Sequence, residues 1–586
     1  MKWDLTYLYK DKESYDKDFQ ELTTYEEKLG SYKGKLSNEE DFVNYLKASD
    51  EYEKLISRLY QYCSLRADQN RKIVENVAEL SKVYTIMDKV SIATSFDYPE
   101  FMSLDKDYIY STIEKHPEIG FHKFDFDKML REKDHILDEK SEKIISSYSK
   151  LSRSSSDLYT NLTNSDNNAK EITLVNGDKV SVSQSNWTSL IEKADNEEDR
   201  KAIFEACFSF YDLHKNTLAK IYENVMEANK AITNIRHYSC ILDTHLYGNN
   251  IPLEVYYNLV DVASSNTDAL KKYIKLREKY LGLEEYHTYD RFIQLAKVDD
   301  EYTYEKAKQI YFESIKDFPD KFQEHAHETL KDGFVDVYPG DGKRTGAYSS
   351  SVVDTHPFIL LNFNSTLDDV FTIAHESGHS IHSLFAMENQ KGHMQDYTIF
   401  VAEIASTFNE HNLLDYFMKS MKSSKETKIV LLQKAIDSIV ATFYRQTLFA
   451  DYELRVSKMV EAGEPINYEV LSGIMIELYK NYYGLDITKE KVKEYVWAYI
   501  PHMFHTPFYV YQYATSFSAS FKIYKDIKEG KEGAFDRYIN LLKSGGSKYP
   551  VEQAKEAGVD FTTKDSFMAV VERMNYLVDE LEKLLN

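Results

Sequence analysis

Proline, glycine and cysteine are all scarce in this sequence of 586 residues. It contains ten prolines and 20 glycines, well below the average usage of about 5% for proline and about 7% for glycine. Because both residues interrupt helices, their scarcity predicts long helices and little irregular structure. The three cysteines, Cys63, Cys207 and Cys240, lack C-x-x-C spacing. That pattern disfavours a disulfide framework and a thiolate zinc site.

Long apolar runs and excess positive charge are also missing. No run of 18 or more apolar residues occurs, which argues against a transmembrane helix, and the first residues lack the apolar core of a signal peptide. The net charge of −24 would repel nucleic acid and anionic membranes and would attract basic substrates. The sequence therefore predicts a cytoplasmic protein that binds neither nucleic acid nor membrane and has no evident obligate protein partner.

Periodic patterns predict a mainly α-helical chain with two regions of β structure. Successive amphipathic patterns over residues 12–165 indicate helices. Two alternating runs, 172–175 and 179–182, flank Asn176-Gly177, which is a typical hairpin signal. We place a domain boundary just after this hairpin. The predicted domains are an N-terminal helical domain, 1–195, and a catalytic domain, 196–586.

A small β-sheet is predicted within residues 333–363. An alternating run at 334–338, a turn at 339–342 and runs at 346–350 and 358–361 read as short strands. An exposed strand edge beginning at Gly346 and Ala347 could pair with an extended peptide through main-chain hydrogen bonds. An ordinary loop at a strand end is the alternative interpretation of these two residues.

The most informative motif is His375-Glu376-Ser377-Gly378-His379, which has the pattern H-E-x-x-H. On an α-helix, residues i and i+4 lie on one face, so His375 and His379 can share one Zn²⁺ at about 2.0–2.1 Å. Glu376 lies about 100° around the helix, where it can reach a metal-bound water without binding the metal. Acidic residues before the motif and an apolar stripe after it predict a helix here. Two surface histidines beside a salt-bridged glutamate are the alternative.

Tetrahedral zinc needs a third protein ligand besides two histidines and a water. An elongated motif with a third histidine is excluded by His382 and Phe385, and a thermolysin-like glutamate is excluded by Ile399. The remaining downstream carboxylates are Glu388, Asp396, Glu403 and Glu410. Glu403 is preferred, because it stands in an apolar helical run. Burying an unpaired carboxylate there would cost several kcal/mol, and a bound metal would compensate for this cost. Glu410 lies two turns further along the same face and is expected to orient a metal ligand without binding the metal itself.

These motifs together resemble the oligoendopeptidase F branch of the thimet-oligopeptidase-like zinc peptidases. The matching segments are residues 3–9, 342–349, 375–382, 402–407 and 501–515, so the resemblance runs nearly end to end. It implies a mainly helical ellipsoid split by a deep channel, and an intracellular endopeptidase that cleaves short peptides and spares folded proteins. Ser377 and Ser516 depart from the family pattern, where Leu and Gly are expected.

The resemblance also implies roles for individual residues. His375, His379 and Glu403 would bind one Zn²⁺ per chain, Glu376 would be the general base, and His382 would support the ligands together with Glu410. The expected reaction is metal-assisted hydrolysis, in which zinc lowers the pKa of its bound water to about 7 and Glu376 removes the proton.

A segment rich in histidine and tyrosine is expected to contact the substrate. By resemblance, His502, Tyr509 and Tyr513 would face the substrate and the developing oxyanion, and Tyr511 competes with them for the same role. Without the resemblance, a helix rich in Tyr and Phe would be interpreted as protein core. Two other functions remain open, a zinc carboxypeptidase of related fold and a non-catalytic peptide-binding protein.

Overall fold

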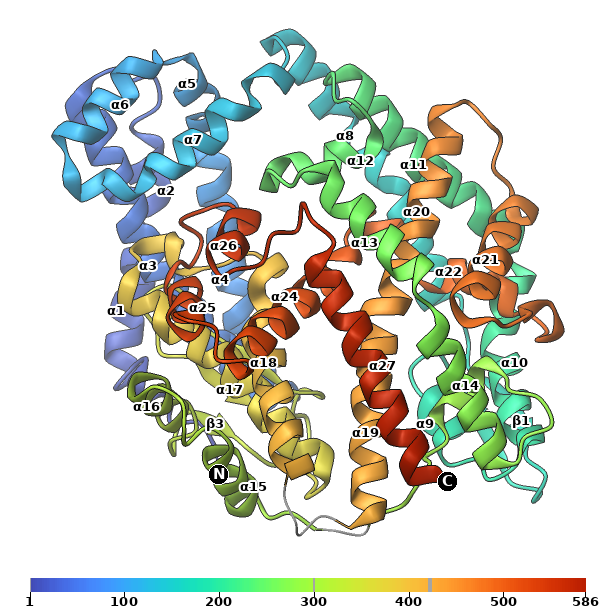
Figure 1. The fold of residues 1–586 in the computed structure, drawn as a ribbon. Coiled ribbons are helices and arrows are strands. Elements are labelled where there is room, and N and C mark those ends of the chain that lie inside the picture. Colours follow the sequence, from blue (N-terminus) through green and yellow to red (C-terminus); the bar gives the residue numbers. More distant parts are fainter. Residues whose placement is uncertain (1, 299–300, 420–423) are drawn as a thin grey trace. The chain divides into compact units, whose positions relative to one another are not determined.

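The computed structural model describes residues 2–298, 301–419 and 424–586 and is mainly helical (Figure 1). Within those residues, β structure is limited to one two-stranded and one three-stranded sheet. The predicted mainly α fold class is therefore confirmed. Among the described helices, none combines the length and apolar character that a membrane span requires.

The chain folds into two compact units, each assembled from three stretches of sequence. Unit 1 comprises Met1–Lys133, Asp299–Tyr416 and Ile523–Val559, and unit 2 comprises Asp134–Val298, Phe417–Lys522 and Asp560–Asn586. The predicted boundary near residue 195 stays a prediction about how the sequence is organised.

Unit 1 contains the small sheet and the helix that carries the H-E-x-x-H motif. Its helices and strands are α1 (Lys12–Leu22), α2 (Tyr25–Gly30), α3 (Glu39–Gln69), α4 (Val74–Thr94), α5 (Asp97–Ser103), α6 (Lys106–Lys115), α7 (Lys123–Arg131), α15 (Tyr304–Ser314), α16 (Asp320–Thr329), β3 (Val335–Asp336), β4 (Tyr348–Ser350), β5 (Phe358–Leu360), α17 (Leu367–Asn389), α18 (Ile399–Lys419), α25 (Ala534–Lys543) and α26 (Pro550–Glu556). Two short 3₁₀ helices, η2 (Pro117–His122) and η7 (Gly392–Gln395), also belong to it.

Unit 2 contains the β-hairpin and the segment rich in His and Tyr. Its helices and strands are α8 (Glu139–Thr160), β1 (Lys170–Thr173), β2 (Lys179–Val182), α9 (Trp187–Glu192), α10 (Glu197–Leu213), α11 (Lys215–Ile235), α12 (Ile241–Leu246), α13 (Leu253–Ser265), α14 (Asp268–Leu281), α19 (Lys425–Ile439), α20 (Arg445–Glu461), α21 (Tyr468–Tyr483), α22 (Val496–Tyr499), α23 (His502–His505) and α27 (Asp565–Leu585). Helix α24 (Tyr511–Lys528) begins in unit 2 and ends in unit 1.

The three-stranded sheet of unit 1 has the order β3-β5-β4, with β3 parallel and β4 antiparallel to the central β5. The predicted small sheet before the motif helix is therefore present. Trp3 anchors the N-terminal segment to it, since its indole Nε1 donates to the carbonyl of Ile359 at 2.8 Å. Strand β4 is an edge strand, and one of its two sides has no strand partner.

Unit 2 is held together by long helices packed along one another. Helices α19 and α27 run side by side (Figure 1). The predicted hairpin is present, because β1 pairs antiparallel with β2 and Ile172 lies opposite Val180. Gly177 adopts a φ of 90° in the connecting turn, a conformation that glycine reaches without steric strain.

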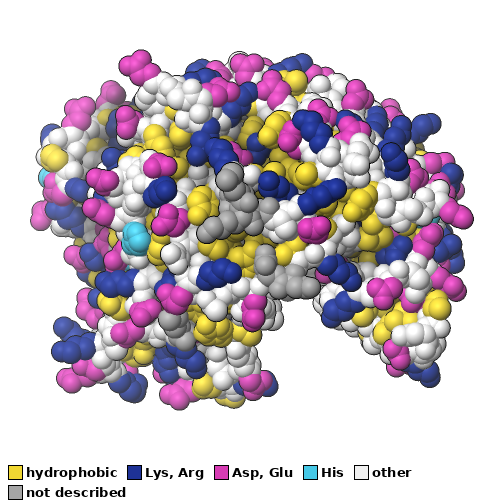
Figure 2. Space-filling view, turned by 60° about the horizontal axis from the view of Figure 1, so that its bottom comes forward, with side chains coloured by type: hydrophobic (Ala, Val, Ile, Leu, Met, Phe, Trp, Pro, Cys, Tyr) yellow, Lys and Arg dark blue, Asp and Glu magenta, His cyan; other side chains and the backbone are white. Residues whose placement is uncertain are grey.

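The molecular surface is strongly charged but mixed in sign. On the face shown in Figure 2, Asp and Glu side chains are interspersed with Lys and Arg side chains. Such interspersed charge keeps a large protein well solvated. The negative net charge of −24 is thus spread over a surface that also carries many cations.

Candidate active site

Helix α17 carries the H-E-x-x-H motif and begins with a capping box. The Thr366 side chain accepts from the Asp369 amide, and the Asp369 carboxylate accepts from the Thr366 amide at 2.9 Å. This reciprocal pair satisfies two amides that the helix itself leaves unpaired. The predicted helix through the motif is therefore confirmed, and it places the two motif histidines one turn apart on one face.

Gly378 sets how closely α18 approaches α17. A Cβ built on Gly378 would lie 2.5 Å from the carbonyl oxygen of Ala405 and 2.7 Å from the Cα of Ser406. Glycine thus allows backbone contact at a point where any side chain would clash. Since Glu403 lies two residues before Ala405 on α18, this contact brings its carboxylate to the histidines of α17.

Three side-chain donor atoms converge where α17 and α18 meet. The Nε2 atoms of His375 and His379 lie 3.2 Å apart. The Oε2 atom of Glu403 lies 3.5 Å from each of them. These three residues form a group that could hold one metal ion. Glu388, an alternative from the sequence, instead pairs with Lys321 at 2.9 Å.

Side chains behind this group fix its orientation. Glu410 Oε1 lies 2.5 Å from His375 Nδ1, so this nitrogen carries the proton and Nε2 faces the other two donors. His379 hydrogen-bonds the backbone of Ala402, and Ser406 Oγ donates to Glu403 Oε2 at 2.8 Å. A proton on each Nδ1 would leave both Nε2 atoms able to bind a metal.

His382 is buried near the site but does not touch the three donors. Its ring stacks on Tyr397 with a centroid distance of 3.6 Å, and the Tyr397 hydroxyl lies 3.3 Å from the carbonyl oxygen of His379. Burial lowers the pKa of His382 to about 3, and His379 lowers it further. His382 is therefore neutral and supports α17 through Tyr397.

Glu376 lies in a buried setting beside the edge strand β4. Its side chain is 6% exposed and accepts a hydrogen bond from the backbone amide of Ser349. Burial raises its pKa to about 7, Glu403 adds to the rise, and His375 opposes it. A carboxylate with a pKa near neutrality can both accept and donate a proton under physiological conditions. The contact with Ser349 was not predictable from local sequence patterns, because it depends on how the sheet packs against α17.

A pocket of about 950 Å³ in unit 1 contains these groups. It is lined by Ala347 and Ser349 of the β4 region, by the motif residues His375, Glu376 and His379, and by Glu403. Gly346 lies beside it, with its carbonyl accepting from Asn362 Nδ2 at 2.7 Å. Further carboxylates, Glu53 and Asp396, line the pocket together with Lys128, so its lining is predominantly acidic.

Ser377, which departs from the family pattern, lies in a buried polar network on the far side of α17. Its Oγ lies 2.9 Å from Thr329 Oγ1 and donates to the Tyr311 hydroxyl at 3.2 Å. Asn409 of α18 donates to that same hydroxyl at 2.9 Å and to the carbonyl of Ala374 at 3.0 Å. The serine therefore links α17 to α16 and α15, and Asn409 links α18 to the same Tyr311 hydroxyl. Ser516, the other departure, is buried, and its hydroxyl has no hydrogen-bond partner among the described residues.

The predicted His/Tyr segment forms an aromatic cluster in unit 2. The rings of His502 and Tyr509 stack at 5.6 Å, and Tyr513 lies edge-on to both at 6.2 and 5.7 Å. All three are only partly buried. Tyr511 differs, because it is 2% exposed and packs on the buried Tyr256 at 5.0 Å. This placement favours a packing role for Tyr511 over the predicted contact with substrate.

Glu453 holds the backbone just before Tyr509. Its Oε1 accepts from the amide of Phe508 at 2.8 Å, and Phe508 has a φ of 59°, a left-handed conformation that is strained for a bulky residue. Burial raises the pKa of Glu453 to about 8, against the lowering effect of the Phe508 amide. A buried, largely neutral carboxyl thus stabilises the strained turn that presents Tyr509.

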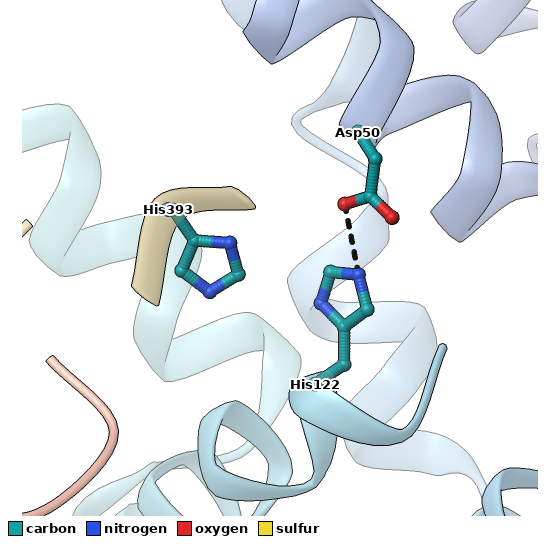
Figure 3. Close-up of side chains that lie close together, drawn as sticks. All are labelled: Asp50, His122 and His393. Carbon is teal, nitrogen blue, oxygen red and sulfur yellow. Dashed lines mark hydrogen bonds and ion pairs between the residues drawn. The ribbon is translucent and has the colours of Figure 1, made fainter. Parts of the chain in front are cut away.

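A second cluster in unit 1, which the sequence did not predict, consists of two histidines and three carboxylates. Figure 3 shows His122 of η2 pointing toward Asp50 of α3, with Nε2 and Oδ1 2.9 Å apart, and His393 of η7 beside it. His122 Nδ1 lies 3.5 Å from Asp125, whose Oδ2 is 2.6 Å from His393 Nε2. His393 Nδ1 lies 3.6 Å from Glu53.

This second cluster is an ion-pair network by its geometry. Each of the four imidazole nitrogens faces a carboxylate, whereas the two Nε2 atoms on α17 face each other. Burial opposes a charge on His393, but Asp125 and Glu53 outweigh it and raise the pKa to about 10. At His122, Asp125 and Asp50 likewise outweigh the effect of burial and raise the pKa of the imidazole. We name these five residues the η2–η7 network.

A mainly helical fold with an H-E-x-x-H helix and an adjacent carboxylate defines a metalloendopeptidase. Comparison with known proteins agrees with that class. The family described as Peptidase family M3 matches residues 190–573, and the one described as Oligopeptidase F matches residues 100–168. The chain belongs to peptidase family M3. The resemblance to oligoendopeptidase F that the motifs indicated is thus confirmed.

Individual relatives match the chain over its whole length. Oligopeptidase PepF of Bacillus subtilis is 33% identical, with 100% of this chain and 87% of that protein covered. Group B oligopeptidase PepB of Streptococcus agalactiae is 31% identical, with 100% and 97% covered. The solved oligoendopeptidase-F from Enterococcus faecium has 27% identity and a TM-score of 0.76, and covers 98% of this chain and 99% of that chain. A solved chain from Chlamydophila abortus reaches a TM-score of 0.91 at 32% identity, with 99% and 98% covered.

The close approach at Gly378 leads to a stability prediction. Gly378→Ala should lower the free energy of unfolding by about 1–3 kcal/mol, because α18 must move away from the new methyl group. Gly473→Ala is the matched control, since Gly473 is an exposed residue of α21 and an added Cβ there meets nothing within 4 Å. It should stabilise the protein by up to about 1 kcal/mol. Denaturant melts of both variants measure the difference, and equal effects would contradict the steric argument.

The η2–η7 network predicts a pH-dependent contribution to stability. The folded-state pKa of His393 is about 10, above its unfolded value of about 6.5. Its stabilisation is therefore complete below about pH 6.5 and is lost as pH rises through about 10. At pH 6.5, His393→Asn should lower the free energy of unfolding by about 2 kcal/mol after solvent screening, which is measured as a lower Tm. At pH 10 the decrease in Tm should be much smaller.

The control for this measurement is His327→Asn. His327 is exposed, and no carboxylate pairs with it in the part of the chain described. Its substitution should change the Tm equally at both pH values. The ion-pair assignment would be wrong if the deficit of His393→Asn were constant with pH, or if a chelator abolished it, because a bound metal would respond to chelation.

Proposed function

We propose that this chain is a zinc endopeptidase of the cytoplasm that hydrolyses internal bonds of short peptides. The observation that carries the proposal is the convergence of two imidazole nitrogens and one carboxylate oxygen within 3.2–3.5 Å in a pocket of unit 1. The names of the relatives, oligopeptidase and oligoendopeptidase, support the substrate class.

The donor set fits zinc in kind and in spacing. Ligand bonds of about 2.0–2.1 Å in a tetrahedron separate neighbouring ligand atoms by about 3.3–3.4 Å, close to the separations of His375, His379 and Glu403. Glu410 accepts a hydrogen bond from the Nδ1–H of neutral His375, a tautomer whose Nε2 has a lone pair to offer. When bound, Zn²⁺ supplies Lewis acidity, which activates water near neutral pH and polarises a peptide carbonyl.

Glu376 is proposed to be the general base. It follows His375 directly, does not belong to the three converging donors, and lies in the same pocket. The Ser349 amide fixes one side of its carboxylate, which orients the remaining lone pairs. In this role Glu376 takes a proton from the attacking water and later delivers it to the leaving amine.

The edge strand β4 is proposed to bind the substrate backbone. Ala347 and Ser349 line the pocket beside Glu376, and β4 pairs with β5 on one side only. An extended peptide added to its free edge would be held by main-chain hydrogen bonds whatever its side chains. The acidic lining with Glu53 and Asp396 favours the ammonium end or basic side chains of a peptide over its carboxylate end.

The aromatic cluster of His502, Tyr509 and Tyr513 is proposed to donate hydrogen bonds to the carbonyl oxygen as it gains charge. Tyr hydroxyls and a partly buried imidazole are suitable donors. Burial lowers the pKa of His502, and His505 lowers it further. Glu453 supports this role indirectly, because it stabilises the turn before Tyr509.

Mass spectrometry of peptides of graded length tests the function directly. We expect cleavage at internal bonds, two fragments per cut and no activity after chelation. A ladder of products shortened one residue at a time from the C-terminus would instead identify a carboxypeptidase. Binding without any cleavage would identify a peptide-binding protein.

Two conservative variants in that assay separate the general base from the ligand. Glu376→Gln should keep about one zinc per chain but lose about 10²–10⁴-fold in kcat, since the base is removed and the ligands remain. Glu403→Gln should lose zinc as well as activity. Metal analysis by mass spectrometry measures the zinc content of both variants. Full activity of Glu376→Gln, or full zinc content of Glu403→Gln, would each refute the corresponding role.

Tyr513→Phe and Tyr511→Phe compare the hydroxyls of two tyrosines that lie two residues apart on α24. Tyr513 is partly exposed and Tyr511 is buried. Tyr513→Phe should lower kcat more than about tenfold with little change in KM, as expected for a donor used in the transition state. Tyr511→Phe should leave kcat nearly unchanged. The reverse pattern of kcat values would transfer the role to Tyr511.

A further inference from the structure

A second pocket, of about 290 Å³, lies entirely within unit 2. Its lining contains one carboxylate, Asp437, and three side chains that can carry positive charge, Arg291, Arg445 and Lys493. Its size is near the lower end of the range for small-molecule sites. None of its residues belongs to the proposed catalytic machinery.

The two arginines in this pocket have no direct carboxylate partner among the described residues, although Asp437 lines the same pocket. Within the described residues, neither Arg291 nor Arg445 forms an ion pair or donates a side-chain hydrogen bond. Burial lowers the pKa of Arg291, and the nearby Arg445 lowers it further. Both side chains are half-buried, and holding two like charges near each other in a partly desolvated pocket is costly, so an anion bound beside them would stabilise the arrangement.

The carboxylates near the pocket are engaged elsewhere. Asp437 accepts from the Tyr273 hydroxyl at 2.8 Å and from Gln433 at 3.3 Å. Glu490, which faces Lys493, accepts from the amide and the hydroxyl of Thr288 at 2.8 and 2.6 Å. Burial lowers the pKa of Lys493 to about 7 despite Glu490. The cations of the pocket therefore outnumber the carboxylates available to neutralise them.

The walls of the pocket are aromatic. Tyr479 and Tyr483 stack at 5.2 Å, and Phe204, Phe208 and Tyr286 complete the apolar lining. Such faces accept a flat apolar group. The continuous helix from α19 to α20 also widens to a π-helical turn at Val440–Tyr444, directly before Arg445, and Val440 and Ala441 of this turn line the pocket. π-helical turns are costly and occur frequently at functional sites.

We propose that this pocket binds a small ring-bearing oxyanion, a carboxylate or phosphate whose charged end lies between Arg291 and Arg445 and whose ring lies against the tyrosines. The guanidinium fork suits both kinds of oxyanion, because it donates two parallel hydrogen bonds. The occupant would also contact Tyr499, which lines the pocket three residues before His502.

Isothermal titration calorimetry on the full-length protein tests the proposal, with phenyl phosphate, benzoate and inorganic phosphate as probes at constant ionic strength. Saturable 1:1 binding is expected, with at least one ring-bearing probe bound more tightly than inorganic phosphate. Arg291→Gln and Arg445→Gln should each weaken that binding at least tenfold. Arg153→Gln, which removes the same charge from an exposed position of α8, should leave it unchanged.

Thermal melts keep the test valid if a variant folds poorly. The probe should raise the Tm of the wild type saturably, by about 2 °C or more. Arg445→Lys, which keeps the charge but loses the fork, should retain only part of this rise. Absence of binding by every probe, binding that survives both Arg→Gln changes, or equal affinity for inorganic phosphate would each overturn the proposal.

Discussion

The contact between Gly378 and the backbone of Ala405 is the constraint on which the candidate active site depends. It fixes the separation of α17 and α18 at a point between the two histidines and Glu403, since a Cβ would lie 2.5 Å from the Ala405 carbonyl. A shift of about 1 Å in either helix would be enough to spoil a three-donor site. The glycine inside the motif thus costs helix propensity and secures the position of a ligand from a different helix.

Contacts on the face of α17 that is turned away from the pocket hold the helix in a fixed position. Ser377, Thr329, Tyr311 and Asn409 form a buried network in which the hydroxyls and the amide nitrogen are hydrogen-bonded. Within the described residues only the Asn409 Oδ1 atom of this network lacks a partner, and directional buried hydrogen bonds of this kind specify a particular packing. The serine that departs from the family pattern is therefore a substitute tie between helices, and it lies on the face of α17 opposite the pocket.

Local patterns in the sequence were sufficient for the motif helix, the small sheet and the hairpin, because each depends on residues close in sequence, whereas Glu403 as the third ligand stays a prediction. They were insufficient for Ser349, His122 and His393, whose contacts join segments far apart in the chain. Periodicity also could not separate Tyr511 from Tyr513, since both lie in one apolar run. The two units could not be predicted by searching for a single linker either, because each is built from three separate stretches of the chain.

The chain leaves charge unmatched at two places, and the two places have opposite sign. In unit 1, carboxylates outnumber cations around the three converging donors, and a divalent cation and the amine of a peptide would restore the balance. In unit 2, Arg291 and Arg445 lack carboxylate partners in a protein of net charge −24. Elsewhere in the described structure, buried charges such as Arg200 with Asp290 and Lys343 with Asp336 are paired. Since unmatched charge in a partly buried pocket destabilises the fold, a ligand of opposite charge at each of these two places would compensate for that cost.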